Sequence, residues 1–193
     1  SIWPKRQPTI MAEVRVLILR APGTNCDQET AFAFDKAGAT SQIAHINRVI
    51  EQPTLVTDAQ ILCLPGGFSY GDDIAAGRIA AGQIRHRLAD VLQAMRNAGK
   101  LILGICNGFQ ILLKSGILLP DADDGTPPAT LSWNDSGRYE ARWVNLRTDG
   151  DRSPFLRGIT SLYLPITHPE GKFIAADDGP LSQLGDAKQL ALR

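Results

Sequence analysis

The sequence has no surplus of charge of either sign, because 20 lysines and arginines balance 20 aspartates and glutamates. Proteins that bind nucleic acids or anionic lipids mainly through their electrostatic field carry an excess of basic residues. The chain also lacks an apolar run that approaches the roughly 20 residues needed to span a bilayer. We therefore expect neither nucleic acid nor a membrane as its partner.

Cysteine is scarce as well. The chain has three cysteines, Cys26, Cys63 and Cys106, which is an odd number and lacks the spacing of metal ligands. Such usage fits the reducing cytoplasm better than a disulfide framework. The sequence thus predicts a cytoplasmic protein with no metal site.

The length of 193 residues predicts a single domain. Residues 1–13 are mostly polar at their start and contain two prolines, and Met11 stands just before the first apolar strand, so we interpret them as an N-terminal extension. Residues 14–193 are then expected to form the domain. Residues 189–193 look like a strand that has begun, and we expect this domain to lack its C-terminal part.

Strand patterns alternate with helical patterns along most of the chain. Strands are expected at residues 14–19, 41–46, 59–64 and 101–105, and helices at residues 27–37, 80–98 and 107–118. Residues 139–147 and 162–167 also have the composition of strands. The order predicts an α/β fold, a flavodoxin-like three-layer sandwich with a mainly parallel central sheet and a β-rich second half.

The most informative motif is Gly104-Ile105-Cys106-Asn107-Gly108, which separates an apolar strand from an amphipathic helix. Its Gly-x-Cys-x-Gly pattern is the thiol counterpart of the Gly-x-Ser-x-Gly nucleophile elbow, where small residues permit a strained turn. A thiol at a helix N-terminus meets unpaired N–H groups and the positive end of the helix dipole, which favour the attacking thiolate. We expect Cys106 to be a nucleophile for acyl chemistry rather than a buried apolar side chain.

Such a nucleophile needs an oxyanion hole. The N–H group of Asn107, directly after Cys106, is the natural first donor, and the turn Pro65-Gly66-Gly67-Phe68 at a neighbouring strand end offers a second from Gly67 or Phe68. Taken alone, this turn is about as well explained by a tight bend that needs glycine. The motif predicts that the two strand ends meet at one site.

The other cysteines and histidines differ in their surroundings. Cys63 lies inside an apolar strand and is expected in the core, whereas Cys26 lies in a strand-end loop that could approach the site without taking part in the chemistry. Among the histidines, only His168 stands at a strand end with a carboxylate, Glu170, two residues further on. A histidine with an orienting carboxylate is the partner that a thiol nucleophile requires, although His-x-Glu is a weak signal.

Four strings together resemble one known family. They are Gly23-Thr24-Asn25-Cys26-Asp27, Pro65-Gly66-Gly67-Phe68-Ser69-Tyr70-Gly71-Asp72, Gly104-Ile105-Cys106-Asn107-Gly108-Phe109-Gln110 and His168-x-Glu170-Gly171-x-Phe173. The chain is similar to the glutaminase subunit of phosphoribosylformylglycinamidine synthase, a class I glutamine amidotransferase of de novo purine biosynthesis. The elbow is shared by that whole class, whereas the second and third strings are specific to this branch.

The resemblance implies an activity and partners. Cys106 would attack the side-chain amide of L-glutamine, release ammonia and form a thioester that water hydrolyses. Gln110 matches a residue that helps to hold glutamine, and Gly66, His168 and Glu170 would lie in the same pocket. The subunit itself would need no cofactor. A large synthase subunit, in some bacteria joined by a small third one, would use the ammonia with ATP and Mg²⁺.

One departure from the family concerns the catalytic base. The family's triad histidine and glutamate lie in a Pro-His-Pro-Glu-Arg string near the C-terminus, and this sequence has no such string before Arg193. His168 and Glu170 match an earlier segment beside the glutamine pocket, so a role for them as triad members is the weaker interpretation. On these grounds the chain is expected to hydrolyse glutamine poorly.

Two other functions stay open at the level of sequence. A protein of the DJ-1 type also carries a cysteine elbow but acts in stress response or on glycated and aldehyde substrates, and Gln110 and the Gly-Gly-Phe-Ser loop argue against it. The third possibility is a catalytically incomplete docking subunit.

Residues 133–143, with two arginines among aromatic side chains, are as well explained by a contact surface as by a half-buried strand.

Overall fold

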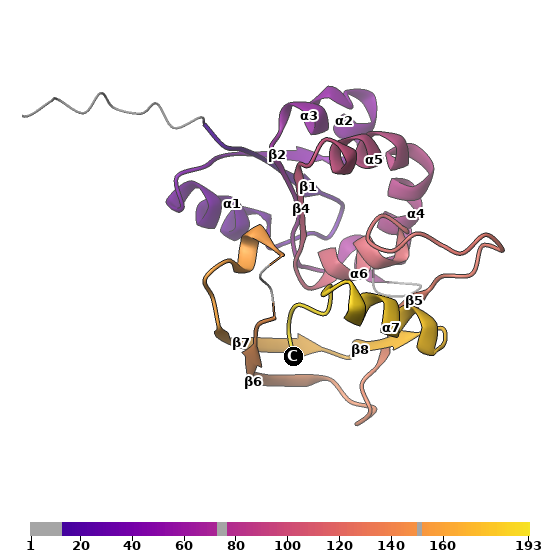
Figure 1. Cartoon of the computed structure of the whole chain (residues 1–193). Helices are drawn as coiled ribbons and strands as arrows, with labels where there is room; N and C mark the ends of the chain where they lie inside the picture. The colour runs from indigo at the N-terminus through magenta and orange to yellow at the C-terminus, as the bar shows by residue number, and fades with distance from the viewer. Residues whose placement is uncertain (1–12, 73–76, 150–151) are drawn as a thin grey trace, which may run out of the picture. The chain divides into compact units, whose positions relative to one another are not determined.

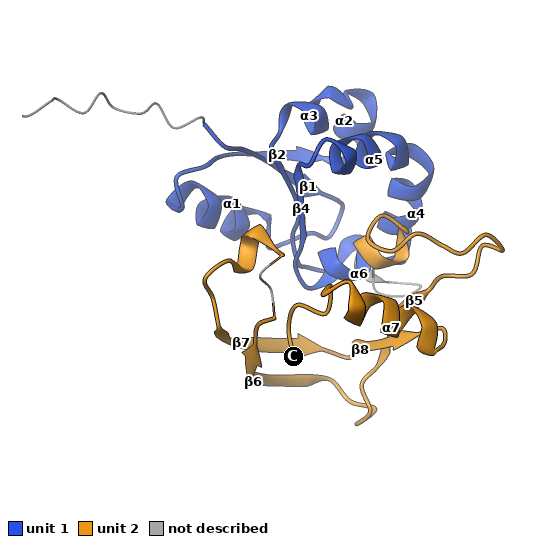
Figure 2. Ribbon diagram, in the orientation of Figure 1, with its two compact units in different colours: residues 1–111 blue, residues 112–193 orange. Residues whose placement is uncertain are grey.

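The computed structural model describes residues 13–72, 77–149 and 152–193 (Figure 1). Most of the extension predicted for residues 1–13 lies outside these ranges. The chain divides into two compact units, residues 1–111 and 112–193 (Figure 2). Each unit is described by itself below.

A parallel sheet forms the centre of the first unit. Its strands are β1 (Arg15–Arg20), β2 (Thr40–His45), β3 (Ile61–Leu64) and β4 (Leu101–Gly104), in the order β2-β1-β3-β4. All the neighbouring strands run parallel, and Leu64 at the end of β3 lies beside Gly104 at the end of β4. The parallel sheet is confirmed, and its register brings the turn after β3 next to the cysteine elbow after β4.

Helices cover both faces of this sheet, as the three-layer prediction requires. The helices of the unit are α1 (Asp27–Lys36), α2 (Ile46–Glu51), α3 (Thr54–Asp58), α4 (Arg78–Arg87), α5 (Ala89–Asn97) and the start of α6 (Asn107–Lys114). One face of the sheet buries Val16 and Ile18 against Phe34 of α1. Figure 1 shows α2, α3 and α5 on the side of the sheet opposite α1.

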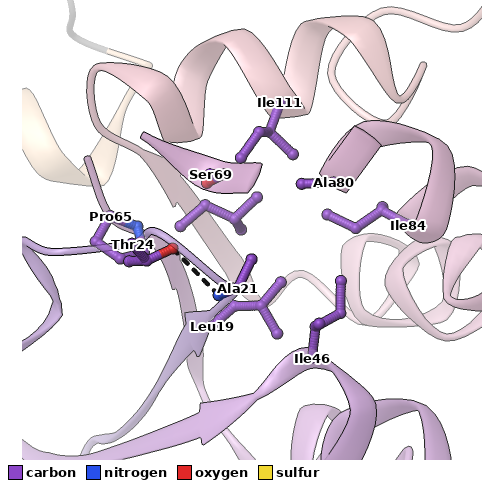
Figure 3. Close-up of a pocket in the computed structure, with 10 residues that line it drawn as sticks. Leu19, Ala21, Thr24, Ile46, Pro65, Ser69, Ala80, Ile84 and Ile111 are labelled. Carbon is purple, nitrogen blue, oxygen red and sulfur yellow. Dashed lines mark hydrogen bonds between the residues drawn. The ribbon is translucent and has the colours of Figure 1, made fainter. Parts of the chain in front are cut away.

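Alternation along β1 explains why both layers form. Successive side chains of a strand point to opposite faces, so Leu19 lies on the face opposite Ile18. There it lines a small cavity with Ile46, Ile84 and Ile111, whose side chains lie around it in Figure 3. The uninterrupted apolar run of β1 is therefore what a strand buried on both faces needs.

The structure departs from the sequence prediction between residues 80 and 98. The single long helix expected there is two helices, α4 and α5, which meet at Leu88, where φ is −128°. Leu88 is only 1% exposed, and Ile84 before it and Leu92 after it are equally buried. The break lets apolar residues of both helices enter the core. Helices α2 and α3 were not predicted at all.

The second unit is built from antiparallel pairs, which confirms a β-rich second half. Strand β5 (Ala129–Trp133) pairs with β8 (Glu170–Ala175), β6 (Glu140–Arg147) pairs with β7 (Ser161–His168), and α7 (Asp178–Asp186) follows. The end of the chain, expected to begin a strand, makes an isolated bridge between Leu192 and Thr148. The prediction missed β5, β8 and α7.

Gly108 offers a test of the packing in the first unit. A Cβ atom added to Gly108 would overlap the carbonyl oxygen of Leu64, so we expect Gly108→Ala to lower the free energy of unfolding by about 2–3 kcal/mol. Urea unfolding followed by circular dichroism measures the change.

Gly82 within α4 is the matched control, because a Cβ there meets nothing within 4 Å. Gly82→Ala should raise the stability by up to about 1 kcal/mol through helix propensity. If the two variants unfold at the same urea concentration, the close approach of α6 to β3 is not a real constraint.

Candidate active site

The cysteine elbow has the backbone geometry of a strained turn. Cys106 lies between the end of β4 and the start of α6, its φ is +53°, and its side chain is exposed. A positive φ is uncommon for a residue other than glycine and costs on the order of 1–3 kcal/mol, and such strain clusters at functional sites. The turn therefore presents the Cys106 thiol at the carboxyl end of the parallel sheet.

Two glycines allow other chain segments to approach this turn. Gly108 packs directly over the carbonyl oxygen of Leu64, and that oxygen also accepts a hydrogen bond from the Ile105 N–H at 3.0 Å. Gly66 lies beside Cys106, because a Cβ on Gly66 would stand 3.4 Å from the Cβ of Cys106. The absence of a side chain at Gly66 leaves space next to the thiol.

Helix α6 begins directly after Cys106. The Cys106 carbonyl oxygen accepts hydrogen bonds from the N–H groups of Phe109 (3.0 Å) and Gln110 (3.2 Å), as in a first helical turn. The thiol thus lies at the N-terminal end of α6, which is the positive end of the helix dipole. This arrangement is suited to nucleophilic attack on a carbonyl carbon.

The predicted oxyanion donors occupy two places. Asn107, which is 2% exposed, follows Cys106, and Gly67 lies in the turn after β3 with φ +121°. A Cβ on Gly67 would stand 2.5 Å from the Oδ1 of Asn25, so the loops after β1 and β3 pack tightly. The Phe68 N–H donates to the Gly23 carbonyl oxygen at 3.2 Å. This hydrogen bond occupies the Phe68 N–H and makes Gly67 the better second donor.

Gln110 is buried in the first turn of α6. Its Oε1 accepts a hydrogen bond from Asn107 Nδ2 at 3.1 Å, and its side chain is 8% exposed. Buried amides are held in place by such bonds, because an unpaired polar group in the interior is costly. The bond thereby joins two side chains of the first turn of α6, and the role of Gln110 in holding glutamine stays a prediction.

The remaining two thiols have different environments. Cys63 is fully buried in β3, as expected, and burial raises its pKa to about 12. Cys26 is exposed, and its Sγ lies 3.8 Å from the position that a Cβ on Gly66 would take, so it flanks the same glycine as Cys106. Burial, and then the negative charges of Glu29, Cys106 and Asp27, raise the pKa of Cys26.

His168 and Glu170 belong to the second unit. His168 ends β7, and its Nδ1 lies 3.0 Å from the Oδ1 of Asn134. Glu170 begins β8, and its carboxylate lies 3.8 Å from the ammonium group of Lys114. The first unit thus brings Gly66 and Asn107 next to Cys106. A pairing of Cys106 with His168 stays a prediction.

The sequence did not single out two polar residues that lie beside predicted site residues. Asn25, against Gly67, lies in the Gly-Thr-Asn-Cys-Asp string that was noted for the resemblance, so a signal existed. Asn134, against His168, follows a strand that was not predicted, and nothing in its sequence context marks it. Within the described residues there is no group of three or more His, Cys, Asp or Glu side chains that could hold a metal ion.

No helix among the described residues is both long enough and apolar enough to cross a membrane.

Comparison with known proteins identifies the family. Residues 13–193 match the model of the CobB/CobQ-like glutamine amidotransferase domain. The phosphoribosylformylglycinamidine synthase subunit PurQ of Dehalococcoides mccartyi is 45% identical over 169 residues, which cover 87% of this chain and 66% of that protein. The same subunit of Archaeoglobus fulgidus is 34% identical, and the matched residues cover 94% of this chain and 72% of that protein.

The chain spans 65–66% of the length of the PurQ relatives from Dehalococcoides mccartyi and Methanococcus maripaludis. Among solved structures, one described as PurLQS from Thermotoga maritima superposes with a TM-score of 0.70 at 31% identity, covering 86% of this chain and 71% of that one. A glutamine amidotransferase of Thermotoga maritima, at 16% identity and a TM-score of 0.54, shares the fold. The chain therefore belongs to the glutamine amidotransferase family, in the branch formed by the PurQ subunits.

Proposed function

We propose that this chain is the glutaminase component of phosphoribosylformylglycinamidine synthase, which hydrolyses L-glutamine and supplies ammonia. The observation that carries the proposal is the exposed Cys106 at φ +53° between β4 and α6, in a chain of the PurQ family. Serine and cysteine elbows of this shape serve acyl transfer. The side-chain amide of glutamine is an acyl group of that kind.

The reaction begins with attack of the Cys106 thiolate on the side-chain amide carbon of glutamine. The carbonyl oxygen becomes an oxyanion, to which the N–H groups of Asn107 and Gly67 donate hydrogen bonds. Collapse of this intermediate breaks the C–N bond, and the nitrogen takes up the proton that the Cys106 thiol gave up and leaves as ammonia. Water then hydrolyses the glutamyl thioester to glutamate and restores the thiol.

The residues around the elbow would bind the substrate. Gly66 leaves room beside the thiol, and the amide of Gln110 is held in the first turn of α6. We place His168 and Glu170 at the glutamine pocket as binding residues, where a carboxylate such as that of Glu170 can hold the ammonium group of an amino acid. A role for the pair as general base and orienting group is the weaker alternative.

The ammonia is passed to a large synthase subunit, which uses ATP and Mg²⁺ to convert formylglycinamide ribonucleotide to its amidine. The name PurLQS, given to the similar Thermotoga maritima structure, supports an assembly with a large and a small further subunit. ATP and Mg²⁺ act in the partner subunit, and the whole assembly works in the cytoplasm. The PurQ relatives favour this function over a DJ-1 type of activity.

The nucleophile is tested by covalent labelling with a diazo ketone analogue of glutamine. We expect one adduct, on Cys106, because burial and negative neighbours keep Cys63 and Cys26 as thiols near neutral pH. Mass spectrometry of the digested protein locates the adduct. Cys106→Ser should abolish labelling and Cys26→Ser should preserve it, whereas a protein without any adduct, or with one on Cys26, would contradict the proposal.

Gln110 is tested by the concentration dependence of the same labelling. We expect Gln110→Ala to raise the half-saturating concentration of the diazo ketone about fivefold, because one hydrogen bond is worth roughly 1 kcal/mol. Ser115→Ala is the matched control, since Ser115 is also buried and its hydroxyl donates within its own turn to the Leu112 carbonyl oxygen. Equal half-saturation in both variants would remove Gln110 from the glutamine site.

A further inference from the structure

Asn134 is a buried amide to which the proposed function assigns no role. It directly follows β5, is 8% exposed, and its backbone N–H donates to the Pro169 carbonyl oxygen at 2.9 Å. Its side-chain Nδ2 donates to two carbonyl oxygens, that of Arg138 at 2.9 Å and that of His168 at 2.8 Å. Both hydrogens of the amide nitrogen are therefore used.

These two bonds determine which way the amide faces. If oxygen and nitrogen were exchanged, the Asn134 oxygen would face two carbonyl oxygens, which cannot donate. The Oδ1 must therefore be the atom that lies 3.0 Å from His168 Nδ1. Because an amide oxygen only accepts hydrogen bonds, Nδ1 has to carry the hydrogen of the neutral ring. The other ring nitrogen, Nε2, then keeps its lone pair.

A glycine holds the imidazole ring from a second side. A Cβ atom added to Gly171 would overlap the Cε1, Nδ1 and Nε2 atoms of His168. The ring lies in the space that any other residue at position 171 would fill with its side chain. Asn134 and Gly171 thus determine both the position and the tautomer of His168.

His45 provides a contrast within the same protein. Its Nδ1 accepts a hydrogen bond from the Asn47 backbone N–H at 3.2 Å, where His45 caps α2. A backbone N–H can only donate, so the hydrogen of the neutral His45 ring has to be on Nε2. The structure therefore gives His45 and His168 opposite tautomers.

We propose that Asn134 is a positioning residue that holds His168 in the Nδ1–H tautomer and so makes Nε2 a hydrogen-bond acceptor of defined direction. The tautomer follows from the hydrogen bonds above. The ligand group that such a nitrogen takes is an N–H or O–H donor.

The tautomer is measured by two-bond ¹H–¹⁵N correlation spectra of the whole chain with ¹⁵N-labelled histidine. The chain has only three histidines, and His168→Gln and His45→Gln assign two of the ring signals. At about pH 9, well above the ordinary histidine pKa of about 6.5, we expect protonated Nδ1 for His168 and protonated Nε2 for His45. Protonated Nε2 in wild-type His168 would overturn the proposal.

Two substitutions separate positioning from a merely structural role. Asn134→Asp loses both Nδ2 hydrogen bonds but keeps an acceptor beside Nδ1, so it should keep the Nδ1–H tautomer. Asn134→Ala also loses both bonds and removes the acceptor as well, and it should shift His168 toward the Nε2–H form. The near-ultraviolet circular dichroism of Trp143 and Tyr163, which are stacked in the same unit as Asn134, reports whether that unit is folded in each variant. If Asn134→Ala leaves the His168 tautomer unchanged while this signal is native, Asn134 does not set the tautomer and the proposal fails.

Discussion

The contact between the backbone of Gly108 and the carbonyl oxygen of Leu64 is the constraint on which the candidate site depends. It lets the first turn of α6 sit directly on the end of β3, although α6 follows β4 in the chain. The same carbonyl oxygen accepts the Ile105 N–H, so the approach to the elbow is held from two sides. Cys106 then has to turn at φ +53°. The strained backbone at Cys106, the proposed nucleophile, is thus the result of close packing around it.

Environment, rather than residue type, distinguishes the three thiols. Cys63 lies in the middle of β3, where burial opposes ionisation, and Cys26 lies near the negative charges of Glu29 and Asp27. Cys26 and Cys106 are both exposed and both stand at the start of a helix, α1 and α6, but of the three cysteines only Cys106 has a positive φ. Gly66 has both Cys26 and Cys106 beside it, and its missing side chain keeps that space open.

Each unit contains a buried side-chain amide that is hydrogen-bonded to a neighbouring polar side chain. In the first, Asn107 and Gln110 bond to each other at the elbow, and in the second Asn134 bonds to His168. A buried amide has donors and acceptors in fixed places, so it imposes an orientation on its partner that an apolar side chain could not. The groups proposed to meet glutamine are therefore preorganised by neighbours that need not touch it.

The parallel sheet, the elbow at Cys106 and the burial of Cys63 could be predicted because they depend on local patterns, namely apolar runs ended by glycine turns. The break at Leu88 and the short helix α2 could not, because burial against distant residues outweighed the local pattern. The sequence by itself determined the chemistry available at Cys106. Only the tertiary structure decided that Cys26 flanks the same glycine, that Phe68 bonds to Gly23 and that Asn134 orients His168, because these contacts join residues far apart in the chain.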